Sequence, residues 1–279
     1  MKYKSGYKII LFGLSGFGSY ALQYILNLGG NIKKIYTRKE KFEHPYFPVR
    51  SITNLARRYK ITYSYNIPNE PEKDIDIIIC SSYHKIIPDN FLTNTKFGAF
   101  NIHPSLLPSY RGATPTKQCL LNNETLSGIT LHKMTKKIDG GGIIAQEKIK
   151  IKSYFDDGLL RQYLSILQYK LILKLFKYLN STKKLDRWDH PCDYIDSYYP
   201  PFKKIEIDYD ANLSIYKLLH QIRASSPFPG LLLKINNKNY NLTKVIRYRK
   251  GINKNSIILN KKTILIKGFD GQLEAIYRH

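Results

Sequence analysis

The stretch Phe97-Gly-Ala-Phe-Asn101-Ile-His-Pro-Ser-Leu-Leu-Pro-Ser-Tyr-Arg-Gly112 decides the fold of this 279-residue chain. Its first six residues are apolar enough to form a buried strand, which delivers Asn101 and His103 at its carboxyl end. Two prolines, Pro104 and Pro108, stiffen the polar segment that follows. Because ligands of open α/β sheets lie outside the carboxyl ends of the strands, we expect a functional site there.

On both sides of this stretch, short apolar runs alternate with segments of helical pattern. Strands are expected at residues 7–12, 34–37, 76–80, 97–102, 128–134 and 142–151, and helices at 14–28, 51–59, 114–121 and 158–180. This alternation predicts an α/β protein with a Rossmann-like, mostly parallel twisted sheet.

The pattern changes after the helix at 158–180. Residues 181–203 are rich in polar and aromatic residues and proline, which is typical of a linker. From residue 204 a strand, a helix and then short β runs separated by Asn-, Gly- and Lys-rich turns follow. We therefore predict an N-terminal α/β domain at 1–180, a linker at 181–203 and a small antiparallel β-rich domain at 204–279.

The composition narrows the class of protein without naming a partner. The net charge is +24, and the basic residues are spread over both halves of the chain, which favours anionic partners in general. No apolar run approaches the roughly 18 residues that a membrane span needs, and no signal peptide is recognisable. The three cysteines are odd in number and widely spaced, as expected in a reducing cytoplasm.

A glycine-rich turn, Gly13-Leu-Ser-Gly-Phe-Gly18, follows the first expected strand. Such a turn can bind an anion at a helix N-terminus. However, its spacing is G-x-x-G-x-G and not the dinucleotide G-x-G-x-x-G, and no acidic residue follows the second strand. The pattern therefore favours a plain tight turn over a dinucleotide site.

An acidic residue, Asp139, accompanies the polar groups of the central stretch and lies in the glycine run Lys137–Gly142. Metal binding needs three or four convergent ligands, and Asn101, His103 and Asp139 offer two good ligands and a poor one. Catalysis by a nucleophilic Ser105 would need a base and an oxyanion hole, and the surrounding prolines form no nucleophile elbow. Both alternatives are therefore disfavoured.

Acyl transfer by direct attack of a substrate nucleophile fits these residues better. Asn101 can donate a hydrogen bond to a developing oxyanion. His103 can do the same when protonated, or act as a general base when neutral. Asp139 would orient the imidazole and raise its pKa.

Three motifs together resemble the folate-dependent formyltransferases: Asn101–Pro115, Gly128–Met134 and Ile138–Gln146. A fourth, Ile222–Gly230, is similar to the sequence that opens the C-terminal domain of the methionyl-tRNA and sugar N-formyltransferases. The resemblance implies a formyltransferase fold and N10-formyltetrahydrofolate as co-substrate, without a metal. It also implies that Asn101, His103 and Asp139 are the catalytic residues.

The same resemblance suggests contacts for the two substrates. Expected folate contacts are Ser82, Tyr83, His84, Lys85, Ile86 and Ile138. Expected contacts to the formyl acceptor are Ser105, Tyr110, Arg111, Tyr199 and Arg223.

The resemblance does not by itself identify the formyl acceptor, because enzymes of this family use different acceptors. The segment Arg38–Pro48 is shorter and less basic than the tRNA-contacting insertion of methionyl-tRNA formyltransferases, and it has no glycine. Thr130–Met134, Gly142–Gln146 and Tyr198–Pro201 look closer to enzymes that formylate nucleotide-linked sugars. We therefore expect a dTDP- or UDP-linked amino-deoxysugar as acceptor, for O-antigen, lipopolysaccharide or another surface glycan. Methionyl-tRNA is the alternative acceptor, and the family resemblance implies a homodimer without membrane attachment.

Overall fold

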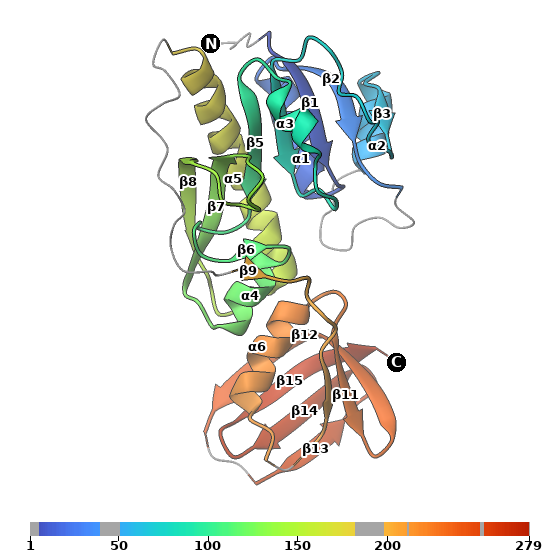
Figure 1. Cartoon of the computed structure of the whole chain (residues 1–279). Coiled ribbons are helices and arrows are strands. Elements are labelled where there is room, and N and C mark those ends of the chain that lie inside the picture. The colour runs from blue at the N-terminus through green and yellow to red at the C-terminus, as the bar shows by residue number, and fades with distance from the viewer. Residues whose placement is uncertain (1–5, 40–50, 182–197, 211, 252–253, 279) are drawn as a thin grey trace. The chain divides into compact units, whose positions relative to one another are not determined.

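The computed structural model describes residues 6–39, 51–181, 198–210, 212–251 and 254–278. An α/β part and a separate C-terminal sheet make up this structure (Figure 1). The α/β part is built on a seven-stranded sheet with the order β3-β2-β1-β4-β5-β7-β8. Its strands are β1 (Lys8–Gly13), β2 (Asn31–Tyr36), β3 (Tyr63–Ser64), β4 (Ile77–Ser81), β5 (Gly98–His103), β7 (Leu126–Lys133) and β8 (Ile143–Lys150).

The centre of this sheet is parallel because its strands are apolar on both faces. All five residues of β4 are buried, as are the last five of β1, so neither strand can turn one face to water. β1 pairs in parallel with β2 and β4, and β4 pairs in parallel with β5. β7 runs antiparallel to β5. The predicted Rossmann-like, mostly parallel sheet is confirmed.

The first helix begins where two glycines let the backbone approach itself. A Cβ atom on Gly18 would lie 2.8 Å from the Cα of Gly13. α1 (Phe17–Asn27) can therefore start directly against the end of β1. The turn predicted at Gly13–Gly18 is thus a site of close backbone packing.

Four further helices belong to the chain up to residue 181: α2 (Ile52–Arg58), α3 (Asp89–Thr93), α4 (Pro115–Leu121) and α5 (Asp157–Leu179). α5 is anchored by Gln168, which accepts a hydrogen bond from Ser81 Oγ at 2.7 Å and donates one to Phe17 O at 3.2 Å. Among the described residues, no helix, α5 included, has the length and apolar character that crossing a membrane requires.

The C-terminal sheet has six strands in the order β10-β11-β12-β15-β14-β13. They are β10 (Glu206–Asp208), β11 (Leu231–Ile235), β12 (Lys238–Lys250), β13 (Ser256–Leu259), β14 (Thr263–Gly268) and β15 (Gly271–Arg278). The pairings are antiparallel as predicted, except that β10 runs parallel to β11 because α6 (Ile215–Ser225) connects the two.

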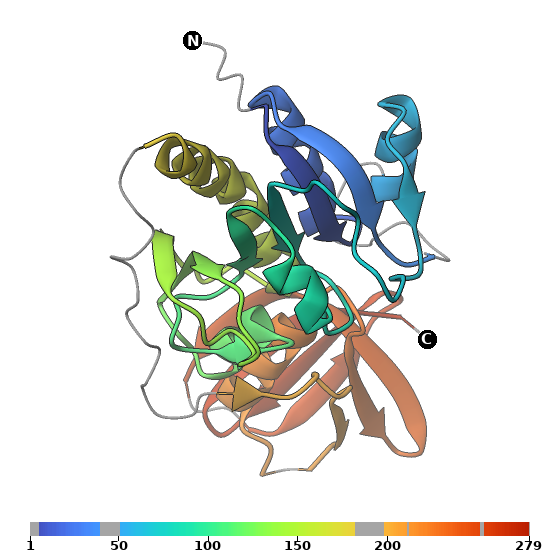
Figure 2. The same ribbon diagram turned by 45° about the horizontal axis from the view of Figure 1, so that its top comes forward.

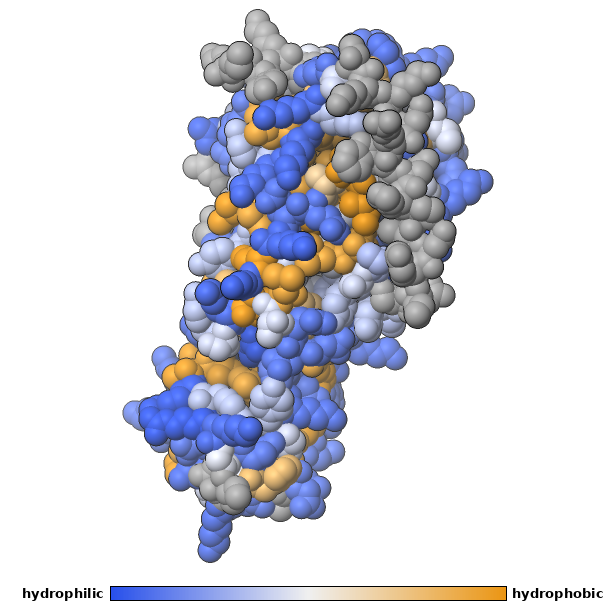
Figure 3. Space-filling view, turned by 90° about the vertical axis from the view of Figure 1, so that its left-hand side faces the viewer, coloured by the Kyte–Doolittle hydropathy of each residue, from blue (hydrophilic) through white to orange (hydrophobic). Residues whose placement is uncertain are grey.

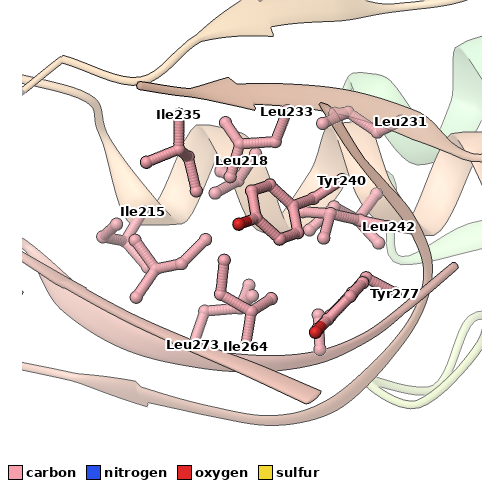
Figure 4. Close-up of a cluster of buried hydrophobic side chains, with 13 residues drawn as sticks. Ile215, Leu218, Leu231, Leu233, Ile235, Tyr240, Leu242, Ile264, Leu273 and Tyr277 are labelled. Carbon is pink, nitrogen blue, oxygen red and sulfur yellow. The ribbon is translucent and has the colours of Figure 1, made fainter. Parts of the chain in front are cut away.

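The alternation of apolar residues along these strands places one face of the sheet against α6 (Figure 2). Leu218 of α6 is fully buried there, together with Leu233, Leu242 and Leu273 of three strands (Figure 4). A sheet with one apolar face needs such a cover, so α6 and the sheet form a core of their own.

The contacts divide the chain into two compact units that do not follow chain order. The first unit comprises Met1–Gly112, Ser127–Ile149 and Arg161–Tyr198, and the second comprises Ala113–Leu126, Lys150–Leu160 and Tyr199–His279. α4 and residues 150–160 therefore belong to the same unit as the C-terminal sheet, and α4 packs against α6. The domain limits at 180 and 204 stay a prediction, and most of the predicted linker lies outside the described residues.

Candidate active site

Asn101 and His103 lie in the last three residues of β5, where the parallel part of the sheet ends. Because β7 runs antiparallel to β5, the register places His132 opposite Asn101 and Thr130 opposite His103. Polar side chains of two neighbouring strands thus meet at one position of the first unit.

The segment after β5 is held in shape by short hydrogen bonds. Thr130 Oγ1 donates to Ser105 O at 2.7 Å and accepts from Leu107 N at 3.0 Å. Ser105 is 2% exposed, and its hydroxyl donates to Ser109 O at 2.7 Å. Ser105 therefore shapes the loop from within, and the acceptor contact expected from the sequence stays a prediction.

His103 is buried, and its two ring nitrogens face different groups. Nε2 lies 2.9 Å from Tyr110 O, and Nδ1 lies 3.5 Å from Asp139 Oδ2. A carbonyl oxygen only accepts, so Nε2 carries a hydrogen. Nδ1 is then the nitrogen that can gain a proton, and the carboxylate of Asp139 faces it.

Asp139 gathers donors from several elements. Its Oδ1 accepts from Asn101 Nδ2 at 3.1 Å, and its Oδ2 accepts from Gly112 N at 2.9 Å. Its backbone has a φ of 48°, a conformation that an L residue rarely adopts. Such a backbone persists only where neighbouring contacts hold it.

Arg111 supplies one of these contacts. Its Nε and one terminal nitrogen lie 3.1 and 2.6 Å from the carbonyl oxygen of Ile138, the residue before Asp139. Arg111 is 4% exposed. These hydrogen bonds show that its guanidinium group holds the loop that carries Asp139, and the acceptor contact expected from the sequence stays a prediction.

The electrostatics favour an ionised Asp139 beside a neutral His103. Burial lowers the pKa of His103 below its ordinary value, although Asp139 and the carbonyl of Tyr110 act in the opposite direction. Asp139 thus raises this pKa, as the sequence predicts, but burial lowers it by more. Burial alone would raise the pKa of Asp139, but the two nearby imidazoles and the N–H of Gly112 hold it well below its usual range.

His132 is a residue of the site that the sequence analysis did not select. It is 2% exposed, and its Nε2 lies 3.1 Å from Asn101 Nδ2 and 3.5 Å from Asp139 Oδ1. Asn101 Nδ2 therefore lies between the imidazole of His132 and the carboxylate of Asp139. The signal was available in the alternating strand Gly128–Met134, but its antiparallel register against Asn101 was not.

The expected folate contacts occupy two surface segments of the first unit. In the loop after β4, Tyr83 packs its ring edge-on against Phe12, at 5.1 Å between centroids, whereas Ile86 is 81% exposed. Ile138, beside Asp139, is 43% exposed. Ser82 has a φ of 61°, while His84 and Lys85 are exposed. Two apolar side chains open to solvent suit a flat aromatic ring system, and the folate contacts themselves stay a prediction.

Two of the expected acceptor contacts belong to the second unit. Arg223 is 7% exposed and donates to Phe155 O at 2.7 Å and to Lys152 O at 3.2 Å, so it holds residues 152–155 in place. Tyr199 lies in β9 (Tyr198–Tyr199), which pairs with β6 (Arg111–Gly112). Tyr110 is half-buried and contributes its carbonyl group to His103. The acceptor contacts expected of Arg223, Tyr199 and Tyr110 stay a prediction.

A surface pocket of about 530 Å³ also lies on the first unit, but its lining does not include Asn101, His103 or Asp139. It is lined by α3, by residues 95–98 and by residues 133–136. Among the described residues, no group of three or more His, Cys, Asp or Glu side chains is arranged to hold a metal ion. The specificity segment Arg38–Pro48 lies mostly outside the described residues.

The sequence profile of a family described as formyl transferase matches residues 31–174, which include all four residues of this site. A bifunctional polymyxin resistance protein, ArnA, from Wigglesworthia glossinidia brevipalpis is 31% identical over 80% of this chain, which spans only 35% of that protein. A methionyl-tRNA formyltransferase from Lactobacillus johnsonii is 28% identical over 96% of this chain and 89% of its own length.

A solved structure shares the fold over almost the whole chain. The N-formyltransferase from Helicobacter canadensis, in complex with folinic acid and dTDP-3-aminofucose, matches with a TM-score of 0.69 and 21% identity. The match covers 98% of this chain and all of that one. The profile match over half of the chain, the shared fold and the assembled Asn101, His103 and Asp139 lead to one conclusion. The chain belongs to the folate-dependent formyltransferase family and is an N-formyltransferase with a folate-derived formyl donor.

Proposed function

We propose that this enzyme transfers the formyl group of N10-formyltetrahydrofolate to the amine of a dTDP- or UDP-linked amino-deoxysugar. The observation that carries the proposal is the position of His103 between the carbonyl of Tyr110 and the carboxylate of Asp139. A neutral imidazole held in this way can accept the proton that an attacking amine must lose.

The reaction requires one carbon–nitrogen bond to form and one to break. The acceptor amine attacks the formyl carbon, and its proton passes to Nδ1 of His103. The imidazolium that results lies between Tyr110 O and Asp139 Oδ2, both of which favour its positive charge. The bond between the formyl carbon and N10 then breaks, N10 takes the proton, and His103 returns to its neutral form.

The choice of a nucleotide-linked sugar as acceptor rests on a structural match and on two sequence motifs. The structure of the Helicobacter canadensis enzyme, which holds dTDP-3-aminofucose, matches 98% of this chain over the whole of its own length. The motifs Thr130–Met134 and Gly142–Gln146 favour the same acceptor class. A role in O-antigen or lipopolysaccharide synthesis in the cytoplasm belongs to this proposal.

Methionyl-tRNA is the second candidate acceptor, and the charge of the C-terminal sheet favours it. Lys244, Arg247 and Arg249 are exposed on β12, where only Arg247 has an acidic partner, Glu274 at 2.8 Å, among the ion pairs of the described residues. The match to the Lactobacillus johnsonii methionyl-tRNA formyltransferase covers most of both chains. A basic strand of this kind suits a phosphate backbone.

A competition between acceptors tests the two candidates. The protein is incubated with N10-formyltetrahydrofolate and either a panel of dTDP- and UDP-linked amino sugars or methionyl-tRNA, and formyl transfer is followed by mass spectrometry. We expect turnover with one class of amino sugar. Turnover with methionyl-tRNA alone, together with tRNA binding that weakens steeply as salt rises, would replace the sugar proposal with the alternative.

The proposed homodimer has a candidate surface on α5. Tyr163, Ile166 and Tyr169 are 42%, 51% and 40% exposed and recur every three residues along the helix. One face of the molecule carries hydrophobic patches between hydrophilic residues (Figure 3). Light scattering of the wild type and of Ile166→Glu tests whether α5 takes part in association.

A further inference from the structure

Gln146, on β8, is a polar residue of the first unit that the proposed reaction does not use. Its Nε2 donates to Leu107 O at 2.8 Å and to Thr130 Oγ1 at 2.9 Å. The two partners belong to other elements, Thr130 to β7 and Leu107 to the segment after β5. A carbonyl oxygen only accepts hydrogen bonds, so the contact with Leu107 O determines which end of the Gln146 amide faces that segment.

Thr130 holds the same segment from the neighbouring strand. It is fully buried and lies opposite His103 in the register of β5 and β7. Its Oγ1 donates to Ser105 O and accepts from Leu107 N as well as from Gln146. A hydroxyl has one hydrogen and two lone pairs, so these three contacts use its full capacity. His103, Thr130 and Gln146 thus lie side by side on the three neighbouring strands β5, β7 and β8.

The segment held in this way leads to a residue with an unusual backbone. Tyr110 has a φ of 60°, a conformation that an L residue rarely adopts and that persists only where neighbouring contacts hold it. Before it, Ser105 Oγ donates to Ser109 O at 2.7 Å, and Ser109 N donates to Leu106 O at 3.1 Å. The segment also packs closely on β7, because a Cβ atom on Gly128 would collide with the side chain of Leu106. The peptide of Tyr110 therefore follows a segment that is fixed at several points.

The carbonyl group of Tyr110 is the group that meets His103. It lies 2.9 Å from Nε2, while Nδ1 of the same ring faces Asp139. A displaced carbonyl would leave the imidazole free to turn away from Asp139. A shift of the segment at Leu107 would therefore reach the base of the proposed reaction.

We propose that Gln146 is a positioning residue of the formyl-transfer site, which acts with Thr130 to hold residues 105–109 so that Tyr110 O keeps His103 in place. The proposal rests on the proposed function, because it needs His103 as the base of that reaction. It predicts a lower kcat with unchanged folate binding, because Gln146 acts through the segment and not through contact with folate.

The first measurement needs no acceptor. Proton NMR of the full-length protein labelled with nitrogen-15 histidine detects hydrogen-bonded ring N–H groups, and His103→Gln identifies the signal of His103. We expect a slowly exchanging Nε2–H signal in the wild type. Gln146→Met keeps the length of the side chain but cannot donate to Leu107 O, so we expect the signal to be broadened or lost. An unchanged signal in Gln146→Met would overturn the proposal.

The second measurement is kcat with the acceptor that the competition identifies. We expect Gln146→Met to lower kcat about tenfold and Thr130→Val, which lacks the hydroxyl, to lower it about 10- to 100-fold. Thr130→Ser retains the hydroxyl and should keep kcat within about threefold of wild type. Because both side chains act on one segment, the double variant should lose little more than Thr130→Val alone.

A matched control lies next to Gln146 on β8. Glu147→Gln removes only the surface ion pairs with Lys170 and Lys174, so its kcat should equal that of the wild type. Binding of 5-formyltetrahydrofolate, measured by calorimetry, should be the same in Gln146→Met, in Glu147→Gln and in the wild type.

The outcomes separate the two levels of inference. Equal kcat for Thr130→Ser and Thr130→Val would overturn the positioning role. A loss of folate binding in Gln146→Met would overturn it as well, because it would show a merely structural role. If no acceptor is formylated, the proposed function fails, whereas the His103 signal of Gln146→Met would still decide whether Gln146 holds the segment.

Discussion

Each unit contains a buried polar cluster. The two clusters consist of similar residues, but we assign one to chemistry and the other to structure. In the first unit, Asp139 lies between two imidazoles, those of His103 and His132. In the second unit, Asp157 is 1% exposed and lies 3.0 Å from Lys117 Nζ and 2.5 Å from Thr116 Oγ1. Each cluster buries a carboxylate beside nitrogen donors.

The partners of the second cluster hold the ammonium group of Lys117 in one position. Lys117 Nζ also donates to the carbonyl oxygens of Ala224 at 2.9 Å and Phe228 at 3.1 Å. The ammonium group thus donates two hydrogen bonds to backbone carbonyls and forms an ion pair with the carboxylate of Asp157. The cluster therefore ties α4, the start of α5 and the turn after α6 together.

The comparison teaches how a buried charge can be assigned to structure or to chemistry. The ordinary pKa of a lysine side chain is about 10.4, so a pair of Lys and Asp is ordinarily charged on both sides near neutral pH. An imidazole gains or loses a proton within that range. Where a carboxylate faces imidazoles and a backbone N–H, a proton can enter and leave, and the cluster can take part in a reaction.

The largest effect should come from the first cluster. Asp139→Asn removes the charge that would stabilise a protonated His103, so we expect turnover to fall by about 10²- to 10⁴-fold. Folate binding, measured by calorimetry, should be retained. Asp89→Asn, which removes only an exposed pair with Lys136, is the matched control and should keep wild-type turnover. Turnover of Asp139→Asn within tenfold of wild type would contradict the role of His103 as base.

The second cluster should respond in stability. Lys117→Met leaves Asp157 buried without its cation, and we expect the free energy of unfolding to fall by about 3–5 kcal/mol. Urea unfolding followed by circular dichroism measures this change. The control is Lys170→Met, which breaks an exposed pair with Glu147 and should cost at most about 1 kcal/mol. Equal losses in the two variants would remove the contrast between the clusters.

A substitution of Arg111 distinguishes support of the Asp139 loop from contact with the acceptor. Lysine keeps the charge but cannot place two N–H groups on the carbonyl of Ile138, so Arg111→Lys should leave the loop of Asp139 less well held. We expect kcat to fall about tenfold with KM for the acceptor almost unchanged. Arg247→Lys, on the C-terminal sheet, is the control. A higher KM for the acceptor with an unchanged kcat would indicate that Arg111 contacts the acceptor instead.

The smallest effect concerns the pKa of His103. Burial favours the neutral imidazole, so NMR titration should place this pKa below the ordinary value of 6.5. Asp139 acts in the opposite direction, so Asp139→Asn should lower the pKa of His103 further. The neutral base is then present at neutral pH in both proteins. A pKa above 6.5 in the wild type would show that the carboxylate outweighs burial.

Much of the fold follows from local patterns. The strand at 97–102, the helix at 158–180 and the short β runs after residue 230 lie within a few residues of β5, α5 and β11–β15. Apolar runs and turn residues predict such elements because burial and backbone sterics act over short distances. The parallel pairing of β10 with β11 was not predicted, because it depends on where α6 returns the chain.

The sequence by itself determined the type of chemistry to expect, and the tertiary structure decided which polar groups meet at the candidate site. Asn101, His103 and Asp139 could be selected from motifs that lie close together in the chain. The tertiary structure added His132 to the site and assigned Arg111 and Arg223 to backbone carbonyls. The physical reason is that a proton's position and a guanidinium's partner depend on antiparallel register, burial and loop conformation. Those properties arise from residues that are distant in the chain and meet only when it folds.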